Sequence, residues 1–396
     1  MSKNIPLSLL LVALLSSANA SQEITLTPLT ITSTAIQTDE LQSTSAVEVY
    51  TAKDIEDAHV QNVYEFLNKS TSVFTTSAYG NPFMQKIDMR GFGVGDGYQN
   101  IVVTINGRKM NNVDMVSQLL SSISPSSIEK IEIIKSSGIV VGGDGANAGI
   151  INIVTKQSND KEISFYMGSY GLVDGAFYLG HQEDKFSFNL NGEAQKSDGV
   201  RYIDNQGNKD ENRFSTLAFD TKYTPNKDLE LRFGANTTHT HVIYMGSMTL
   251  DEFNTDPTQI GTTPWATANT PSRQTFISDL TNTGITYHIN RNLSMSLDFS
   301  KEKKKSDYRG SFNTDTNYDY SQASANFDYI TELFALKVGF DGFYADLDYA
   351  YNSLNINMEK TNQAGFLASE IYLNDITLKA GLRYEKMKFS ESSGDA

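Results

Sequence analysis

The sequence of 396 residues has no cysteine and only eight prolines. A chain without cysteine cannot use disulfides for stability and offers no cysteine nucleophile. It also lacks a G-x-S-x-G nucleophile motif and an H-E-x-x-H zinc motif. Its five histidines are scattered, and the one close pair, His239 and His241, provides fewer than the three or four ligands that a metal needs. We therefore predict no enzymatic activity, no cofactor and no metal site.

Long hydrophobic runs are absent as well. The apolar run Leu7–Leu15 is too short to cross a bilayer, and no later segment has eighteen consecutive apolar residues. Lys3 precedes this run and an Ala18-Asn19-Ala20 cleavage pattern follows it, so residues 1–20 are predicted to be a secretory signal peptide. Basic residues are also fewer than acidic ones. The formal net charge is −15, and loss of Lys3 makes it more negative, which argues against nucleic-acid binding.

Aromatic residues are plentiful, with 20 tyrosines and 21 phenylalanines, although the mean hydropathy is only −0.36. From Glu162 onward apolar and polar residues alternate with a period of two, as in Leu293–Ser300. This combination is typical of a transmembrane β-barrel, in which every second residue of a strand faces lipid. Eleven such segments lie at 163–170, 173–181, 186–191, 213–223, 229–236, 275–289, 293–300, 317–330, 333–349, 362–373 and 376–385.

The connections between these segments alternate in length. Tight turns are predicted at 182–184, 225–228, 290–292, 332 and 374–375, and longer loops at 197–212, 242–273, 306–316 and 350–360. Short periplasmic turns and long external loops are typical of outer-membrane barrels. A soluble β-sandwich would have shorter strands without this alternation, so the pattern favours the barrel.

Residues 46–156 have a different pattern. A capping box at Thr51–Asp54 begins one predicted amphipathic helix that extends to about Asn68. Asn106-Gly107 predicts a hairpin. In Lys130–Lys156, two runs rich in Ile and Val flank a glycine-rich turn, which we interpret as strand, tight turn, strand. A dinucleotide site would need a helix after the glycines, whereas a strand is predicted there. The whole region is predicted to be a compact α+β domain.

Residues 21–45 are rich in Thr and Ser and have no helical period. One interpretation is a disordered linker. The alternative is an extended segment, centred on Leu26–Thr34, that pairs as an added strand with a partner.

Several segments of the 46–156 region, in the right order, resemble the TonB-dependent receptors of the Gram-negative outer membrane. The matching segments are Ala52–Ile55, Ile87–Gly93, Val103–Gly107, Ile128–Ile133 and Gly143–Thr155. The resemblance implies an α+β plug domain at 46–156, followed at 161–396 by the N-terminal half of a barrel that the plug fills. Relative to the family pattern, Asn106 replaces Asp, Lys130 replaces Arg, and Ser136 and Ala148 replace Gly. The last two matter only where the backbone needs a positive φ.

The resemblance also implies partners and sites. The segment 21–45 would contain the TonB box that pairs with the periplasmic energy-transducing protein, at Leu29, Thr30, Ile31, Thr32 and Ser33. The ligand would be a ferric siderophore or another iron chelate. Contacts to it are expected at the plug apex, from Tyr79, Phe83, Phe92, Tyr98 and Gln99. The alternative is that the aromatic residues among them pack against the barrel wall. Outer-membrane lipid would surround the barrel.

The run Lys301–Lys305 is expected at the outer rim, where it would bind lipopolysaccharide phosphates or simply face water. The strand number raises a further question, because plugged transporters have 22 strands and eleven are predicted here. We therefore expect an energy-coupled transporter represented by its N-terminal half. The alternatives are a passive outer-membrane pore or adhesin, and a non-functional truncated product.

Overall fold

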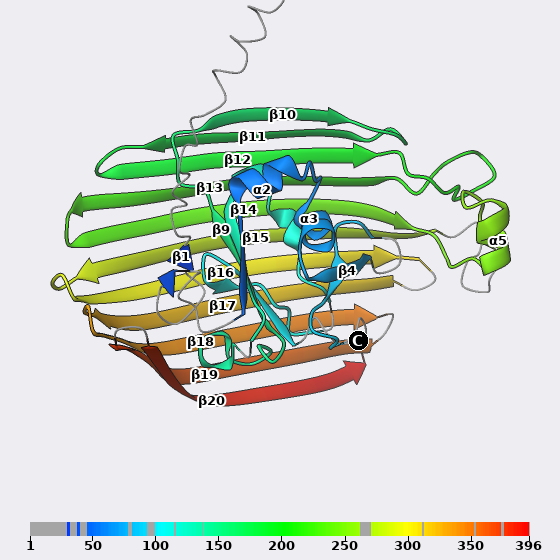
Figure 1. Ribbon diagram of the computed structural model, residues 1–396. Helices are drawn as coiled ribbons and strands as arrows, with labels where there is room; N and C mark the ends of the chain where they lie inside the picture. The colour runs from blue at the N-terminus through cyan, green and yellow to red at the C-terminus, as the bar shows by residue number, and fades with distance from the viewer. Residues whose placement is uncertain are drawn as a thin grey trace, which may run out of the picture.

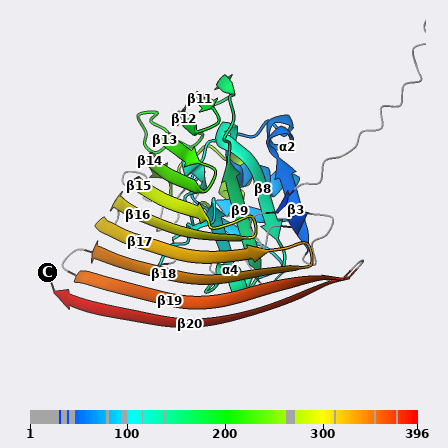
Figure 2. The ribbon, with the colours of Figure 1, turned by 90° about the vertical axis from the view of Figure 1, so that its left-hand side faces the viewer.

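The computed structural model describes residues 30–31, 38–39, 46–77, 81–92, 100–114, 116–136, 138–261, 271–310, 313–351, 354–373 and 376–395. It contains a small domain, residues 46–156, and one large antiparallel sheet, which we call the wall (Figure 1). The small domain lies against the concave face of the wall (Figure 2). No helix among the described residues is long and apolar enough to cross a membrane.

The wall has eleven strands, and each pairs with the next one in sequence. This confirms the eleven predicted strands. Most are longer than the pattern indicated, and β19 and β20 have 20 residues each. The strands are β10 (Lys161–Met167), β11 (Val173–Gln182), β12 (Phe186–Ser197), β13 (Asn212–Asn226), β14 (Leu229–Tyr244), β15 (Ser272–His288), β16 (Leu293–Arg309), β17 (Asn313–Ile330), β18 (Phe334–Tyr351), β19 (Leu354–Leu373) and β20 (Ile376–Asp395).

Two of the four predicted longer loops are present and two are wrong. The chain between β12 and β13 and the chain between β14 and β15 are long, and the second carries α5 (Leu250–Thr255). The predicted loops 306–316 and 350–360 are instead mostly strand, because β16 and β17 pair up to Arg309 and Asn313, and β18 and β19 up to Tyr351 and Leu354. The start of β17 is mainly polar, with Thr314, Asp315 and Thr316, and so carries no apolar signal. The start of β19 does carry one, because Leu354, Ile356 and Met358 alternate with polar residues.

The small domain contains a five-stranded sheet in the order β3–β8–β9–β6–β7. Its core is an apolar cluster that includes Phe66, Leu67, Ile131 and Ile151. The sheet is mixed because β6 pairs in parallel with β9, whereas the other neighbours are antiparallel. Its strands are β3 (Val47–Thr51), β6 (Ile101–Ile105), β7 (Arg108–Lys109), β8 (Ile128–Ile134) and β9 (Gly149–Thr155); β4 (Phe74–Ser77) and β5 (Gln85–Asp88) form a separate hairpin.

The single helix predicted from Thr51 to Asn68 is wrong, because two helices occupy this stretch. The capping box is present, with the Thr51 side chain accepting from Asp54 N–H, but α2 (Ala52–Asp57) ends after six residues. His59 then has a φ of +47°, which no helix allows. The second helix, α3 (Val63–Ser70), has its own N-cap at Asn62. The apolar spacing across the break resembles one continuous helix, and for this reason the sequence pattern misses the break.

The turn between β8 and β9 is also more than a tight turn. A short helix, α4 (Ile139–Gly142), precedes the glycines, and β9 follows them as predicted. Gly149 has a φ of +145°, and a Cβ on it would lie 2.1 Å from the Ile134 carbonyl oxygen. The glycines therefore shape the backbone, in agreement with the rejection of a dinucleotide site.

Candidate functional site

A cleft of about 770 Å³ separates the small domain from the wall. Side chains from both bodies line it, and each body contributes both positive and negative charges. The charged lining residues from the small domain are Arg108, Lys109, Asp114 and Asp144; those from the wall include Asp220, Glu302, Lys304, Lys360, Arg383 and Glu385. The cleft is thus a polar, balanced surface along which the two bodies meet.

The β6–β7 hairpin brings two of these cations to the wall. Its turn residues, Asn106 and Gly107, have φ values of +49° and +83°, as a type I′ turn requires. The Asn106 side chain also donates to Thr155 Oγ1 at 2.9 Å and accepts from Thr155 N–H at 3.1 Å, which fixes the hairpin to β9. The turn predicted from the sequence is therefore present, and Arg108 and Lys109 come directly after it in the chain.

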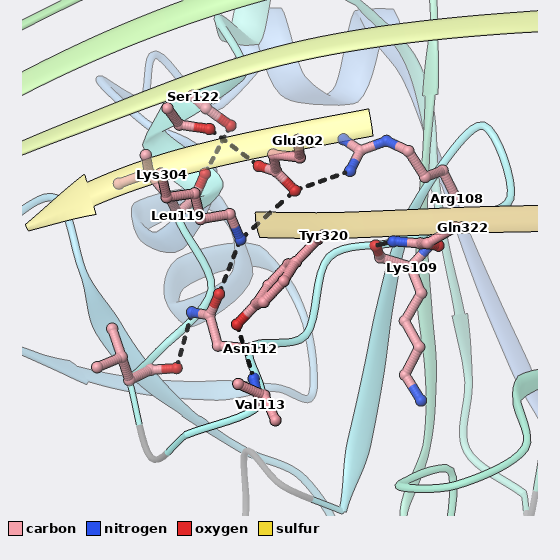
Figure 3. Close-up of polar contacts among 12 residues, drawn as sticks. Arg108, Lys109, Asn112, Val113, Leu119, Ser122, Glu302, Lys304, Tyr320 and Gln322 are labelled. Atoms are coloured by element: carbon pink, nitrogen blue, oxygen red, sulfur yellow. Dashed lines mark hydrogen bonds and ion pairs between the residues drawn. The ribbon is translucent and has the colours of Figure 1, made fainter. Parts of the chain in front are cut away.

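Glu302 on β16 lies between a cation from each body (Figure 3). Its Oε2 is 3.4 Å from Arg108 Nη1 of the small domain and 3.5 Å from Lys304 Nζ of the wall. Ser278 Oγ donates to the other oxygen at 2.9 Å. The side chain of Lys304 is only 5% exposed. A buried carboxylate needs such compensation, because an isolated buried charge is strongly unfavourable.

Lys304 also reaches into the small domain. Its Nζ donates to Asn112 Oδ1 at 2.8 Å and lies 4.7 Å from the centre of the Tyr320 ring. The Tyr320 hydroxyl in turn accepts from Val113 N–H at 3.0 Å. These contacts fix the chain after β7 to strands β16 and β17 (Figure 3).

Gln322 of β17 holds the backbone of Lys109 in the manner of a neighbouring strand. Its Oε1 accepts from Lys109 N–H at 3.2 Å, and its Nε2 donates to the Lys109 carbonyl at 2.6 Å.

Burial lowers the pKa of the Lys109 ammonium to about 8, although the Asp144 charge opposes this shift. Lys109 is therefore still mostly protonated at neutral pH.

Asp114 forms a further contact with the wall. The Tyr318 hydroxyl donates to Asp114 Oδ2 at 2.9 Å. Burial raises the pKa of the Asp114 carboxyl, and the Tyr318 hydrogen bond opposes that rise. Apolar contacts accompany this hydrogen bond, because Met84 and Leu119 of the small domain belong to one buried cluster with Phe276, Tyr318 and Tyr320 of the wall.

Only some of the predicted ligand residues lie within the described chain. Phe83 is 2% exposed, and its ring centre is 5.5 Å from that of Phe214 on β13. It packs against the wall, together with Val242. Phe92 is 42% exposed. Tyr79, Tyr98 and Gln99 lie outside the described residues. Of the two described residues, only Phe92 keeps substantial exposed surface, and the other three ligand contacts stay predictions.

The expectation for Lys301–Lys305 requires a correction. Lys304 faces the cleft, whereas Lys303 and Lys305 are exposed on the opposite face of β16. The run therefore divides between the two faces of the strand, and the expectation of an outer-rim patch applies only to its members on the outer face. His239 and His241 have no third ligand, since the described chain contains no group of three His, Cys, Asp or Glu residues able to hold a metal ion.

The departures from the family pattern have simple explanations. Lys130 forms an ion pair with Glu132 at 2.8 Å, so it keeps the positive charge. Asn106 tolerates the positive φ of its turn. Neither Ser136 nor Ala148 has a positive φ. Glycine is therefore not required at either of these two positions.

The residues that join the two bodies, including Arg108, Asn112, Glu302, Lys304 and Gln322, were not predicted. One signal was available. On β16 the apolar residues Leu297 and Phe299 have the outward phase, so Glu302 and Lys304 have the inward phase. No signal in the sequence identifies which residue of the small domain each of them meets.

Comparison with known proteins identifies the small domain. Residues 39–150 match the family model of the TonB-dependent Receptor Plug Domain. The small domain is a TonB-dependent receptor plug domain. We call the small domain the plug from here on. The Rhizobactin receptor of Rhizobium meliloti (strain 1021) is 30% identical over 82 residues, which are 21% of this chain and 11% of that protein.

Solved structures agree on the fold of the whole described chain. The ferric citrate transporter FecA in its unliganded form matches with a TM-score of 0.75 at 15% identity, over 89% of this chain and 57% of FecA. The ferric yersiniabactin uptake receptor FyuA from Yersinia pestis matches with a TM-score of 0.69 at 16% identity, over 88% and 57%. The chain thus spans little more than half the length of these receptors. The predicted fold class, an α+β plug followed by barrel strands, is confirmed.

Proposed function

We propose that this protein is a TonB-dependent receptor of the outer membrane and that it takes up a scarce ligand in an energy-coupled manner. The proposed ligand is a ferric siderophore or another iron chelate. The observation that carries the proposal is the plug, which is seated on the inner face of the wall through polar contacts such as Lys304 to Asn112 and Arg108 to Glu302. Polar contacts beside a cleft can be exchanged for contacts with water when the two bodies separate, as a gate requires. The names of FecA, FyuA and the rhizobactin receptor support an iron chelate.

The energy would come from a periplasmic TonB-type protein that binds Leu29–Ser33. Within this segment Thr30–Ile31 (β1) pairs antiparallel with Thr38–Asp39 (β2), so its backbone can form strand pairs. The other three residues lie outside the described chain. A β-branched, extended tract suits strand addition to a partner sheet. We propose that the partner replaces β2 as the neighbour of this segment.

The ligand would contact the plug apex. Phe92 retains exposed surface, and we keep it with Tyr79, Tyr98 and Gln99 as proposed contacts. Phe83, with almost no exposed surface, would act by supporting the apex against Phe214.

The outer face of the wall would meet lipid and lipopolysaccharide. Leu297 and Phe299 are 44% and 48% exposed on β16. Lys301, Lys303 and Lys305 follow at the same phase of the strand. The apolar residues of this face would contact lipid acyl chains. The lysines that follow them along the strand would contact lipopolysaccharide phosphates.

The test is ⁵⁵Fe uptake in a host without other siderophore receptors, with a panel of hydroxamate, catecholate, citrate and mixed chelates. We expect uptake of one chelate class that stops when the TonB-type protein is deleted. Uptake that continues without that protein would favour the passive pore. Absence of both binding and uptake for every chelate would reject the proposal.

A further inference from the structure

The plug turn at residues 138–144 is held by the last strands of the wall. The Val140 carbonyl accepts from Arg383 Nη1 at 3.3 Å, and Asp144 N–H donates to Glu385 Oε1 at 3.3 Å. The Asp144 carboxylate pairs with Lys360 Nζ at 2.5 Å. One short turn thus has three polar contacts with β19 and β20, more than 200 residues away in the sequence.

Arg383 lies at the centre of these contacts. Its side chain is 7% exposed, and its guanidinium bonds Asp341 at 2.8 Å and Glu385 at 3.1 Å in addition to Val140. It also lies 5.8 Å from the centre of the Phe366 ring. Guanidinium has five donors in a fixed plane, so it can bind two carboxylates and a carbonyl together. We call Arg383, Asp341, Glu385, Lys360 and Asp144 the Arg383 network.

Two glycines shape the place where this network meets the turn. Gly143 has a φ of +63°, and a Cβ on it would lie 2.5 Å from Arg383 Nη2. Gly381 faces Val140, and a Cβ on it would lie 2.9 Å from Val140 Cγ2. One glycine on each body therefore allows the close approach. Larger side chains at either position would push the turn off the wall.

The charges of the network are balanced by a further plug residue. Lys109 Nζ donates to the Asp144 carbonyl, so three cations face the three carboxylates of Asp144, Asp341 and Glu385. Burial alone would raise the pKa of the Asp144 carboxyl, but Lys360, with Lys109 and Arg383, holds it below its ordinary value. Asp144 is therefore ionised at neutral pH, and its pairing with Lys360 is electrostatic.

We propose that the Arg383 network is the fastening that keeps the plug turn 138–144 closed against β18–β20, and that its separation opens the lumen on this side of the receptor. Val141, Gly142, Asp144, Lys360, Arg383 and Glu385 all line the cleft. Withdrawal of the turn would therefore widen the existing cleft. The inference rests on the proposed function, because an opening has a purpose only in an uptake receptor.

A charge-reversal cycle tests the fastening without any need for ligand. Asp144→Lys puts a fourth cation against Lys109, Lys360 and Arg383, and Lys360→Asp removes the partner of Asp144. We expect each variant, in the full receptor, to raise the sensitivity of cells to vancomycin roughly tenfold, since each replaces an attractive, partly buried pair by like charges that repel. The double variant restores a pair of opposite charges, so the vancomycin sensitivity should return most of the way to the wild-type level.

The matched control is Asp57→Lys, which reverses a carboxylate in an exposed plug pair with Lys53. It should leave sensitivity unchanged. Equal sensitivity of Asp144→Lys and the wild type, at equal abundance in the outer membrane, would overturn the proposal. So would a double variant as sensitive as the single ones.

A second measurement uses the absence of cysteine. The Cβ of Val140 lies 3.5 Å from the position of a Cβ on Gly381, within the range of disulfides. In the variant Val140→Cys with Gly381→Cys, oxidation should block uptake and reduction should restore it. Equal uptake in both states would overturn the proposal. Loss of uptake in both states would count against the proposed function instead, and the vancomycin assay would still decide the role of the network.

Discussion

Lys304 of the wall donates a hydrogen bond to the side-chain oxygen of Asn112 in the plug at 2.8 Å. The same ammonium lies 3.5 Å from Glu302, which pairs with Arg108 of the plug. One lysine thus satisfies both an amide of the plug and a carboxylate of the wall, and its removal should weaken the seat of the plug.

Lys304→Met should lower the stability of the seated plug by about 3 kcal/mol, because Glu302 then keeps only one cation in a buried position. Calorimetry of the purified receptor in detergent would measure the plug transition. The control is Lys303→Met, one position away on the exposed face, which should change stability by less than about 0.5 kcal/mol. Equal effects of the two variants would reject the role given to Lys304.

Phe83→Ala should destabilise the plug by about 3–5 kcal/mol, because it leaves a cavity against Phe214 and Val242. Phe74→Ala is the matched control, since Phe74 is 53% exposed on the same domain. Phe83→Leu should recover much of the stability and keep ligand affinity. If Phe83→Leu retained stability but lost affinity, Phe83 would be a ligand contact after all.

The Lys109 pKa of about 8 predicts a pH dependence of stability. An unfolded lysine titrates near 10.4, so between roughly pH 8 and pH 10.4 the unfolded chain binds more protons than the folded chain. The free energy of unfolding should therefore rise with pH in this window, by at most about 1.4 kcal/mol per pH unit, and stay flat below it. Chemical denaturation of the wild type and of Lys109→Met at several pH values would measure the difference. A difference that is flat, or that falls with pH, contradicts the assignment.

Asn106→Asp should change plug stability by less than about 1 kcal/mol, because Asp also tolerates a positive φ and still accepts from Thr155 N–H. Asn106→Val should cost more than about 2 kcal/mol, since a β-branched residue is a genuine outlier at that angle. Denaturant midpoints of the two variants would decide this. Similar midpoints would mean that the turn does not hold Arg108 and Lys109 in place.

The fold was largely predictable because its signals are local. The two-residue period revealed all eleven wall strands, and Asn106-Gly107 revealed the hairpin that carries Arg108 and Lys109. The helix break at His59 was missed because the apolar spacing continues across it. The strand ends near Arg309 were missed because their residues are mainly polar. The start of β19 was missed although Leu354, Ile356 and Met358 alternate with polar residues there.

The candidate site was predictable only in part. Alternation along β16 is enough to put Glu302 and Lys304 on the inner face, but not to pair them with Arg108 and Asn112. Such pairings depend on how the plug sits in the wall, and no local pattern encodes that relation. Arg383 was overlooked for the same reason, although Gly143 and Gly381, which make room for its contacts, are visible in the sequence.

The central claim is that force on the N-terminal segment releases the plug from the wall. The most direct test deletes Leu29–Ser33 and measures uptake and surface binding of the same ⁵⁵Fe chelate. The account predicts that uptake is abolished while binding affinity is unchanged. Uptake that survives the deletion would contradict it.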